Sequence, residues 1–352
     1  MQTDFLVVGQ GLCGTWLSWF LTKENKSFVV VDKNEAITPS KVSAGIINPV
    51  TGRRMVRVWM AEQVLPFARE AYTEIGKFLD IIAISQKNII DFFPNVHQRQ
   101  VFLERIDEGE SYLQSYPEQN QFNELFNYSL GCGEIRNCYA AQLQNLLPAW
   151  RQYLINNERL LEETFAFEDL VIKKESIEYH SIHAEKIIFC DGLSSFENPF
   201  FGQLPFAPNK GESLTVEIPA LPPNHIYKKG FVLAPLEEGN LFWFGSNYQW
   251  EFPHHDPTDE FYEQARRHLR AWLKIPFSVL EHKASIRPAT LERRPFVGLH
   301  PQQKNLGILN GMGTKGCSLA PWFANELVQN LVYNNAINPH ADINRFQKIL
   351  SL

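Results

Sequence analysis

The feature of the sequence that most restricts the fold is a glycine motif near its start, Gly9-Gln10-Gly11-Leu12-Cys13-Gly14. The motif follows a short apolar run at 5–8 and precedes apolar residues at helical spacing, and a second apolar run covers 28–31. This order predicts a strand, a glycine turn, a helix and a second strand, which together open a βαβ unit with a buried parallel sheet.

Each glycine of the motif has a separate physical reason. Gly9 permits the tight turn, Gly11 lets the backbone approach a pyrophosphate, and Gly14 lets the helix pack closely on the strand. The free amides at the helix N-terminus favour phosphates. Asp32 ends the second apolar run, where its carboxylate is expected to accept hydrogen bonds from an adenosine ribose, and Lys33 follows it at the same site. The alternative is that Asp32 only ends a strand.

A second glycine-rich turn, Asn310-Gly311-Met312-Gly313-Thr314-Lys315-Gly316, lies near the other end of the sequence. It follows the apolar run 306–309 and precedes an apolar helical stripe, with Pro321 expected in the first turn of that helix. A helix N-terminus stabilises the negative charge that a flavin ring gains on reduction. The turn therefore favours FAD over NAD, and the alternative is an ordinary flexible loop.

The rest of the sequence alternates between two kinds of pattern. Amphipathic helices are expected at 55–78, 139–154 and 260–273. Strands are expected at 89–93, 100–103, 177–179, 186–190, 213–217, 231–234 and 241–244. This arrangement predicts an α/β fold with two discontinuous domains. A Rossmann-like FAD-binding domain is expected to consist of 1–80, 137–205 and 281–352. A mostly antiparallel substrate domain, inserted into it, is expected to consist of 81–136 and 206–280.

Composition narrows the classes of partner. There are 33 Lys and Arg against 39 Asp and Glu, a net charge of −6, and no long basic run, so a nucleic-acid or anionic-membrane partner is not expected. Five scattered cysteines without a CxxC spacing predict neither disulfides nor zinc, and His254-His255 is assigned to a solvated loop instead of a metal site. Without a signal-peptide pattern or a membrane-length apolar stretch, a cytoplasmic location is expected.

Three further segments, taken in order with the two glycine motifs, resemble the D-amino-acid oxidase superfamily of flavoenzymes. They are the segment from Ser40 to Pro49 (SKVSAGIINP), Lys210-Gly211-Glu212, and Ile286-Arg287-Pro288 with the Arg-Arg-Pro segment that follows at 293–298. The superfamily includes glycine and sarcosine oxidases, D-amino-acid dehydrogenases and the flavin domain of a tRNA wobble-uridine modification enzyme.

The resemblance implies FAD as cofactor and oxidation of an amine or amino acid at the flavin face opposite a substrate sheet. It also implies that Ser40, Ala44 and Gly45 lie against the cofactor, that Gly192 lies near the dinucleotide, and that 311–316 lies near the flavin ring. Sarcosine-oxidase-like members attach the flavin through a cysteine near the Arg-Pro segment. This chain has Ile286-Arg287 there, so noncovalent FAD is expected.

Oxidation of an amine by a flavin depends on positioning more than on acid-base groups, so no histidine is assigned a catalytic role. Arg287 is expected to bind the carboxylate of the substrate, because a guanidinium offers two parallel donors and stays charged when partly buried. The alternatives for Arg287 are an ion pair with Glu292 or contact with the flavin. Tyr248 is expected either to present its phenol to the pocket or to serve only in packing.

Three functions remain open at this point. The first is an oxidase or dehydrogenase of a small amino acid or N-alkyl amine. The second is a tRNA-modifying flavoenzyme, because the glycine turn at 310–316 looks closest to that branch, although the acidic net charge counts against tRNA. The third is a flavin-binding protein without turnover. The sequence leaves the substrate, the electron acceptor and the oligomeric state open.

Overall fold

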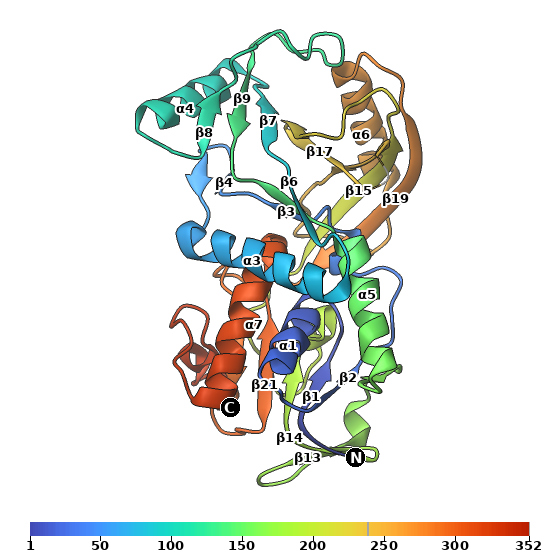
Figure 1. Cartoon of the computed structure of the whole chain (residues 1–352), viewed down its shortest axis with the longest axis vertical. Helices are drawn as coiled ribbons and strands as arrows, with labels where there is room; N and C mark the ends of the chain where they lie inside the picture. Colours follow the sequence, from blue (N-terminus) through green and yellow to red (C-terminus); the bar gives the residue numbers. More distant parts are fainter. Residues whose placement is uncertain (238, 352) are drawn as a thin grey trace.

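The computed structural model of the protein describes residues 1–237 and 239–351 and contains two eight-stranded sheets. One sheet lies in the lower part of Figure 1 together with both termini, and the other lies in the upper part. The α/β class expected from the sequence is therefore confirmed. No helix among the described residues is long and apolar enough to cross a membrane.

The lower sheet has a parallel centre of five strands in the order β11-β2-β1-β14-β21. These are β1 (Gln2–Val8), β2 (Phe28–Val31), β11 (Leu160–Leu161), β14 (Ile182–Phe189) and β21 (Leu306–Asn310). Three strands extend the sheet antiparallel at its edges: β12 (Leu170–Ile172), β13 (Ile177–Tyr179) and β20 (Phe296–Leu299).

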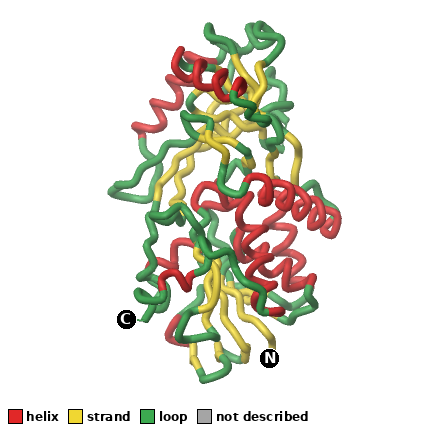
Figure 2. The backbone as a smooth tube through the Cα atoms, turned by 90° about the vertical axis from the view of Figure 1, so that its left-hand side faces the viewer, coloured by secondary structure: helices red, strands yellow, loops and turns green. Residues whose placement is uncertain are grey.

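Both faces of the lower sheet are buried, which explains why its central strands are continuous apolar runs. Phe5 and Val7 of β1 belong to one hydrophobic cluster, whereas Leu6 and Val8 belong to another. The first cluster is completed by α1 (Leu12–Lys23), α3 (Ala61–Leu79), α5 (Leu143–Asn156) and α7 (Gly316–Tyr333). Figure 2 shows these helices gathered on one side of the lower strands.

The upper sheet has the order β19-β15-β18-β17-β16-β7-β9-β8, and every pair in it is antiparallel except β16 with β7. Its strands are β7 (Ile89–Phe92), β8 (Leu113–Ser115), β9 (Cys132–Ile135), β15 (Asn209–Glu217), β16 (Ile226–Lys229), β17 (Phe231–Pro235), β18 (Leu241–Gly245) and β19 (Ser278–Arg287). The helix α6 (Asp259–Trp272) buries Phe261, Leu269 and Trp272 in the same cluster as Leu214, Val216 and Phe244 of the sheet.

The remaining elements lie outside the two large sheets. They are α2 (Pro39–Val42), α4 (Val96–Asp107), β3 (Ile46–Ile47), β4 (Val50–Thr51), β5 (Val56–Arg57), β6 (Ile84–Gln86), β10 (Tyr139–Ala141) and the short 3-10 helices η1 (Phe167–Asp169), η2 (Gly192–Phe196), η3 (Gly313–Lys315) and η4 (Ile343–Phe346). The strands β3, β10 and β6 form a small sheet, and β4 pairs with β5.

One strand expected from the sequence is wrong. Residues 100–103 lie inside α4, where only Phe102 is buried. The helix begins at Asn95, whose side-chain oxygen accepts a hydrogen bond from the Gln98 amide at 2.9 Å. A helix that buries so few side chains shows little apolar periodicity, so the N-terminal cap was its clearest signal.

Three helix starts also differ from expectation. The helix expected at 55–78 begins at Ala61, because β5 occupies Val56–Arg57 and Met60 adopts a left-handed conformation with φ of 56°. The helix expected at 139–154 begins at Leu143, after β10. Pro321 lies in the second turn of α7 instead of the first, because α7 begins at Gly316.

The chain passes between the two sheets several times. The lower sheet takes its strands from 2–31, 160–189 and 296–310, and the upper sheet from 89–135 and 209–287. The strand β19 runs across the domain boundary expected between 280 and 281. The two sheets are thus interleaved along the sequence, whereas the individual domain boundaries stay a prediction.

Candidate functional site

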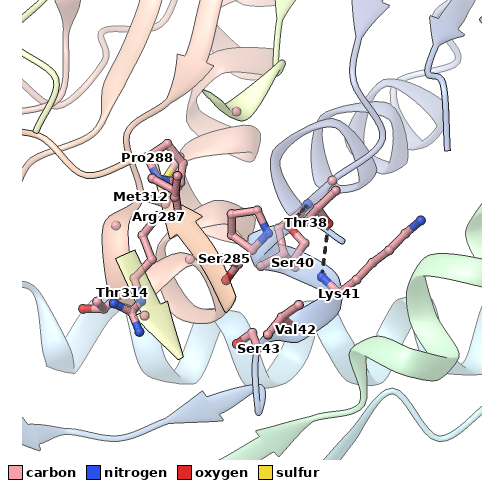
Figure 3. A pocket seen from close by; sticks show the side chains of 18 of the residues that line it. Thr38, Ser40, Lys41, Val42, Ser43, Ser285, Arg287, Pro288, Met312 and Thr314 are labelled. Atoms are coloured by element: carbon pink, nitrogen blue, oxygen red, sulfur yellow. Dashed lines mark hydrogen bonds between the residues drawn. The ribbon is translucent and has the colours of Figure 1, made fainter. Parts of the chain in front are cut away.

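A cavity of about 1020 Å³ lies between the two sheets. Segments of both sheets form its walls, and most of the predicted site residues line it: Gly9, Gly11, Asp32, Lys33, Ser40, Ala44, Gly192, Tyr248, Arg287, Gly313, Thr314, Lys315 and Gly316. Figure 3 shows Ser40, Lys41 and Ser43 on one side of the pocket and Arg287, Pro288, Met312 and Thr314 on the other. Residues far apart in the sequence therefore meet around one space.

Three predicted glycines, Gly14, Gly45 and Gly311, lie behind the cavity wall. A Cβ on Gly14 would overlap the carbonyl oxygen of Gly9, and a Cβ on Gly45 would overlap the carbonyl oxygen of Ala141. Gly311 adopts a φ of +79°, which is unfavourable for a side chain. These glycines shape the backbone around the cavity without facing it.

The first glycine turn presents backbone amides to the cavity. Gly9 has a φ of +97°, and Gly11 caps α1 without a side-chain hydrogen bond. The first amides of a helix have no partner inside the helix, so they are available to an anion. One of them is used by the protein, because the Leu12 amide donates to Ser40 Oγ at 3.0 Å. Ser40 thus lies directly at the N-terminus of α1.

Asp32 is held by several donors of the protein. Its Oδ2 accepts from the Gln10 amide at 2.8 Å, and its Oδ1 accepts from Arg151 Nη1 at 2.7 Å. Arg151 is a buried residue of α5 that also donates to Glu162 Oε2 at 2.8 Å. Lys33 lies beside this group and forms a 3.4 Å ion pair with Glu35. The carboxylate of Asp32 therefore organises the first glycine turn.

The second glycine turn is tied to the Gly192 segment. Asn310 donates from Nδ2 to the Gly192 carbonyl at 2.8 Å and to Ser195 Oγ at 2.7 Å. Ser195 in turn donates to Asp191, whose pKa burial raises to about 6. This network fixes two cavity walls relative to each other.

Lys315 projects from the N-terminus of α7 and donates to Asn48 Oδ1 at 2.7 Å. Burial lowers the pKa of its amine to about 8. The second glycine turn therefore brings a cationic side chain into the cavity in addition to backbone amides.

Arg287 ends β19 on the cavity side of the upper sheet. Its Nη1 donates to Asn209 Oδ1 at 2.6 Å, and its Nη2 donates to Ser246 Oγ at 2.7 Å. The guanidinium lies over Gly211, where a Cβ would overlap it, and over the ring of Tyr248 at 4.8 Å. Burial lowers its pKa.

No acidic side chain among the described residues forms an ion pair with Arg287. Glu292, one of its expected alternatives, instead pairs with Arg345 at 3.1 Å. The side chains that touch Arg287 are neutral, and Tyr248 is itself 59% exposed. Arg287 is thus a partly buried cation on a cavity wall without a carboxylate to balance it.

Lys210 and Glu212 are fully buried on either side of Gly211, and they anchor the segment 246–258 that carries Tyr248. Lys210 Nζ donates to the Asp256 carbonyl at 2.5 Å. Glu212 accepts from the Thr258 amide at 2.7 Å and from Thr258 Oγ1 at 2.9 Å. The Lys-Gly-Glu motif thereby positions the wall around Arg287.

Several of these residues were missed from the sequence. Arg151 stands in the apolar stripe of its helix beside Leu147, Trp150 and Leu154, and a charge in such a stripe was a usable signal. Asp191 and Lys228 also line the cavity and carry no local pattern that marks them as cavity residues, whereas Asn48 stands in the recognised segment 40–49 without having been singled out. Lys210 and Glu212 were recognised as part of a family motif, whereas their anchoring contacts could be seen only in three dimensions.

Comparison with known proteins relates this site to a family. Residues 4–330 match the family model described as FAD dependent oxidoreductase (DAO). The glycine oxidase of Geobacillus kaustophilus is similar in structure, with a TM-score of 0.78, 18% identity and coverage of 98% of both chains. Iminodiacetate oxidase from a Chelativorans species matches with a TM-score of 0.77 and 15% identity, over 97% of this chain and 98% of that one.

A third structure, L-α-glycerophosphate oxidase from Mycoplasma pneumoniae, holds FAD. It matches with a TM-score of 0.72 and 14% identity, over 96% of this chain and 97% of that one. Its substrate is named as a glycerophosphate, whereas the first two enzymes are named for amino acids or amines. At these identities the likeness shows a shared fold, and the substrate has to be argued from the cavity itself.

Proposed function

The chain belongs to the DAO family of FAD dependent oxidoreductases, and from that premise we propose that it oxidises the C–N bond of an amino acid or N-alkyl amine that carries a carboxylate. The observation that carries the proposal is Arg287, a cation without an acidic partner among the described residues, on the cavity wall formed by the upper sheet. A guanidinium in this setting is suited to bind a carboxylate through two parallel hydrogen bonds.

The cavity residues fit FAD on the opposite wall. The uncapped amides of α1 suit the pyrophosphate, Asp32 suits the adenosine ribose, and the second glycine turn with Lys315 suits the pyrimidine edge of the flavin. The proposed cofactor contacts are Gly9, Gly11, Asp32, Lys33, Ser40, Ala44, Gly192, Gly313, Thr314, Lys315 and Gly316. Gly14, Gly45 and Gly311 are proposed to serve the cofactor site by shaping the backbone behind it. Bound FAD supplies the two-electron acceptor that the amine requires.

The protein's own part in the reaction is positioning. Arg287 fixes the carboxylate, and Asn209, Ser246 and Tyr248 fix the guanidinium, so the neighbouring C–H bond is directed toward the opposite wall. The lower and upper sheets would accordingly serve as FAD-binding and substrate domains, with the last boundary after β19 instead of between 280 and 281. Reactions of this kind gain most of their rate from orientation within an enclosed site.

We expect FAD to be bound without a covalent link. Position 286 is an isoleucine, and burial raises the pKa of Cys13 to about 12, of Cys317 to about 11 and of Cys190 well above its usual value, so none of these cavity thiols is a ready nucleophile. Acid precipitation should leave the yellow chromophore in the supernatant. Colour that stays with the pellet would contradict this prediction.

The proposed function is tested by mixing the flavin-loaded protein, without oxygen, with amino acids, N-methyl amino acids, decarboxylated amines and modified tRNA. Bleaching of the flavin absorbance by a carboxylated amine, and not by its decarboxylated analogue, is the expected result. Bleaching only by tRNA, or by none of these compounds while dithionite still reduces the flavin, would refute the proposal.

A further inference from the structure

The cavity floor formed by the upper sheet carries a cation at each side, Arg287 and Lys228. Strand pairing aligns Ser213 with Gly245, Gly245 with Val232, and Val232 with Lys228. Before Lys228 this row itself carries short side chains, and the indole of Trp243, which also lines the cavity, lies 3.0 Å from the position that a Gly245 Cβ would take. All four residues of this row line the cavity.

The two cations lie at a distance that a small molecule can span. The strand order from Arg287 to Lys228 is β19-β15-β18-β17-β16, but the guanidinium already lies over Gly211 of β15 and reaches Ser246 just after β18. From β18 to β16 there are two strand spacings, or about 10 Å. An elongated ligand that lies along this floor of the cavity can therefore approach both Arg287 and Lys228.

Lys228 lies beside one carboxylate and a second lysine. Its Nζ forms a 2.7 Å ion pair with Asp91, which is buried. Lys315 lines the same cavity from the second glycine turn. Burial is the main cause that lowers the pKa of its amine to about 8; Cys138 and Cys317 act to raise it, and the charge of Lys228 adds to the lowering. Lys228 is thus paired with a carboxylate, whereas Lys315 donates to the neutral amide of Asn48.

We propose that the substrate carries a second anionic group, which Lys228 binds while Arg287 holds the first carboxylate. This inference rests on the proposed function and narrows it to amines with two acidic groups, such as amino dicarboxylic acids or N-carboxyalkyl amino acids. Lys228 uses one of its three N–H donors on Asp91, so a second carboxylate can accept from the others, whereas a monocarboxylate leaves them without an anionic partner in a partly desolvated site.

The test measures binding of unreactive acids by the change they cause in the absorbance of the bound flavin. Hexanoate and adipate have the same chain length and differ in the second carboxylate. Adipate should bind about ten- to hundredfold more tightly than hexanoate, the gain expected for hydrogen bonds to a charged group. Glutarate and valerate form a second matched pair of shorter length.

Removal of Lys228 alone would leave Asp91 buried without a partner, so the informative variant replaces both residues, Lys228→Met with Asp91→Leu. This variant should bind hexanoate as the unaltered protein does and lose the preference for adipate. The matched control is Lys229→Met, because Lys229 is the next residue on β16 and donates to the Asn127 carbonyl at 2.7 Å. The control should keep the preference.

The outcomes separate the two proposals. If hexanoate binds and adipate binds no more tightly, or if the double variant retains flavin and still prefers adipate, the second anion site is refuted while the proposed function stands. If neither acid perturbs the flavin of the unaltered protein, the role of Arg287 fails, and the second anion site fails with it.

Discussion

Replacing Arg287 with alanine is expected to raise the KM for a carboxylated amine by about thirtyfold to several thousandfold, because loss of one member of a buried, hydrogen-bonded charge pair costs about 2 to 5 kcal/mol. The corresponding amine without a carboxylate should lose little. Steady-state kinetics with the two substrates measure the difference. Flavin content should be unchanged, since Arg287 contacts Asn209, Ser246 and Tyr248 of the upper sheet.

Two further variants sharpen this prediction. Arg287→Lys keeps the charge and loses the paired donors, so its KM should lie between those of the unaltered protein and the alanine variant. Arg270→Ala removes an exposed arginine of α6 outside the cavity and serves as the control. Equal losses with both substrates, or release of flavin from Arg287→Ala, would show that Arg287 has a different role.

Replacing Asp32 with alanine is expected to weaken FAD binding by about ten- to hundredfold, since hydrogen bonds to a charged group contribute about 1.5 to 3 kcal/mol. The carboxylate accepts from the Gln10 amide at 2.8 Å and from Arg151 at 2.7 Å, so its loss also loosens the first glycine turn. Titration of the flavin-free protein with FAD measures the dissociation constant.

The direct and indirect effects of Asp32 can be separated through Arg151. Arg151→Met removes the ion pair and leaves the Asp32 carboxylate in place. If Asp32 binds the ribose directly, Asp32→Ala should weaken FAD binding more than Arg151→Met does. Asp107→Ala, at an exposed position in α4, is the control. An unchanged dissociation constant in Asp32→Ala would mean that Asp32 only ends a strand.

Local patterns were sufficient to predict the parts of the fold that bury continuous or periodic apolar sequence. The strand, turn and helix around Gly9 to Gly14 are present as expected, because β1 and β2 are buried on both faces and α1 is buried nearly all round. The helix α4 was missed for the opposite reason: only Phe102 of its twelve residues is buried, which leaves almost no periodic signal.

The candidate site could be predicted from the sequence only where one segment forms it alone. The glycine turns carry their own conformational signature, and Arg287 stands in a recognisable motif. Lys228 became a cavity residue only through the register of β16 on β17 and β7. Arg151 reaches Asp32 from a helix more than a hundred residues away. Contacts of this kind depend on the sheet order, which no local pattern encodes.

The interleaving of the two sheets also affects how the protein is made. The strand β1 pairs on one side with β14, which in turn pairs with β21, so the centre of the lower sheet needs residues 2–8, 182–189 and 306–310 together. At translation rates of about 5 to 20 residues per second, β21 leaves the ribosome on the order of 15 to 60 s after β1.

Until β14 has been made, β1 has an open, strongly apolar edge of the kind that associates with other chains, and β14 then has such an edge until β21 follows. Non-local parallel pairing also folds slowly, because the loop entropy is lost before the contacts form. The same topology that brings the two glycine turns to one cavity therefore makes the nascent chain dependent on protection from aggregation until its last strand has been synthesised.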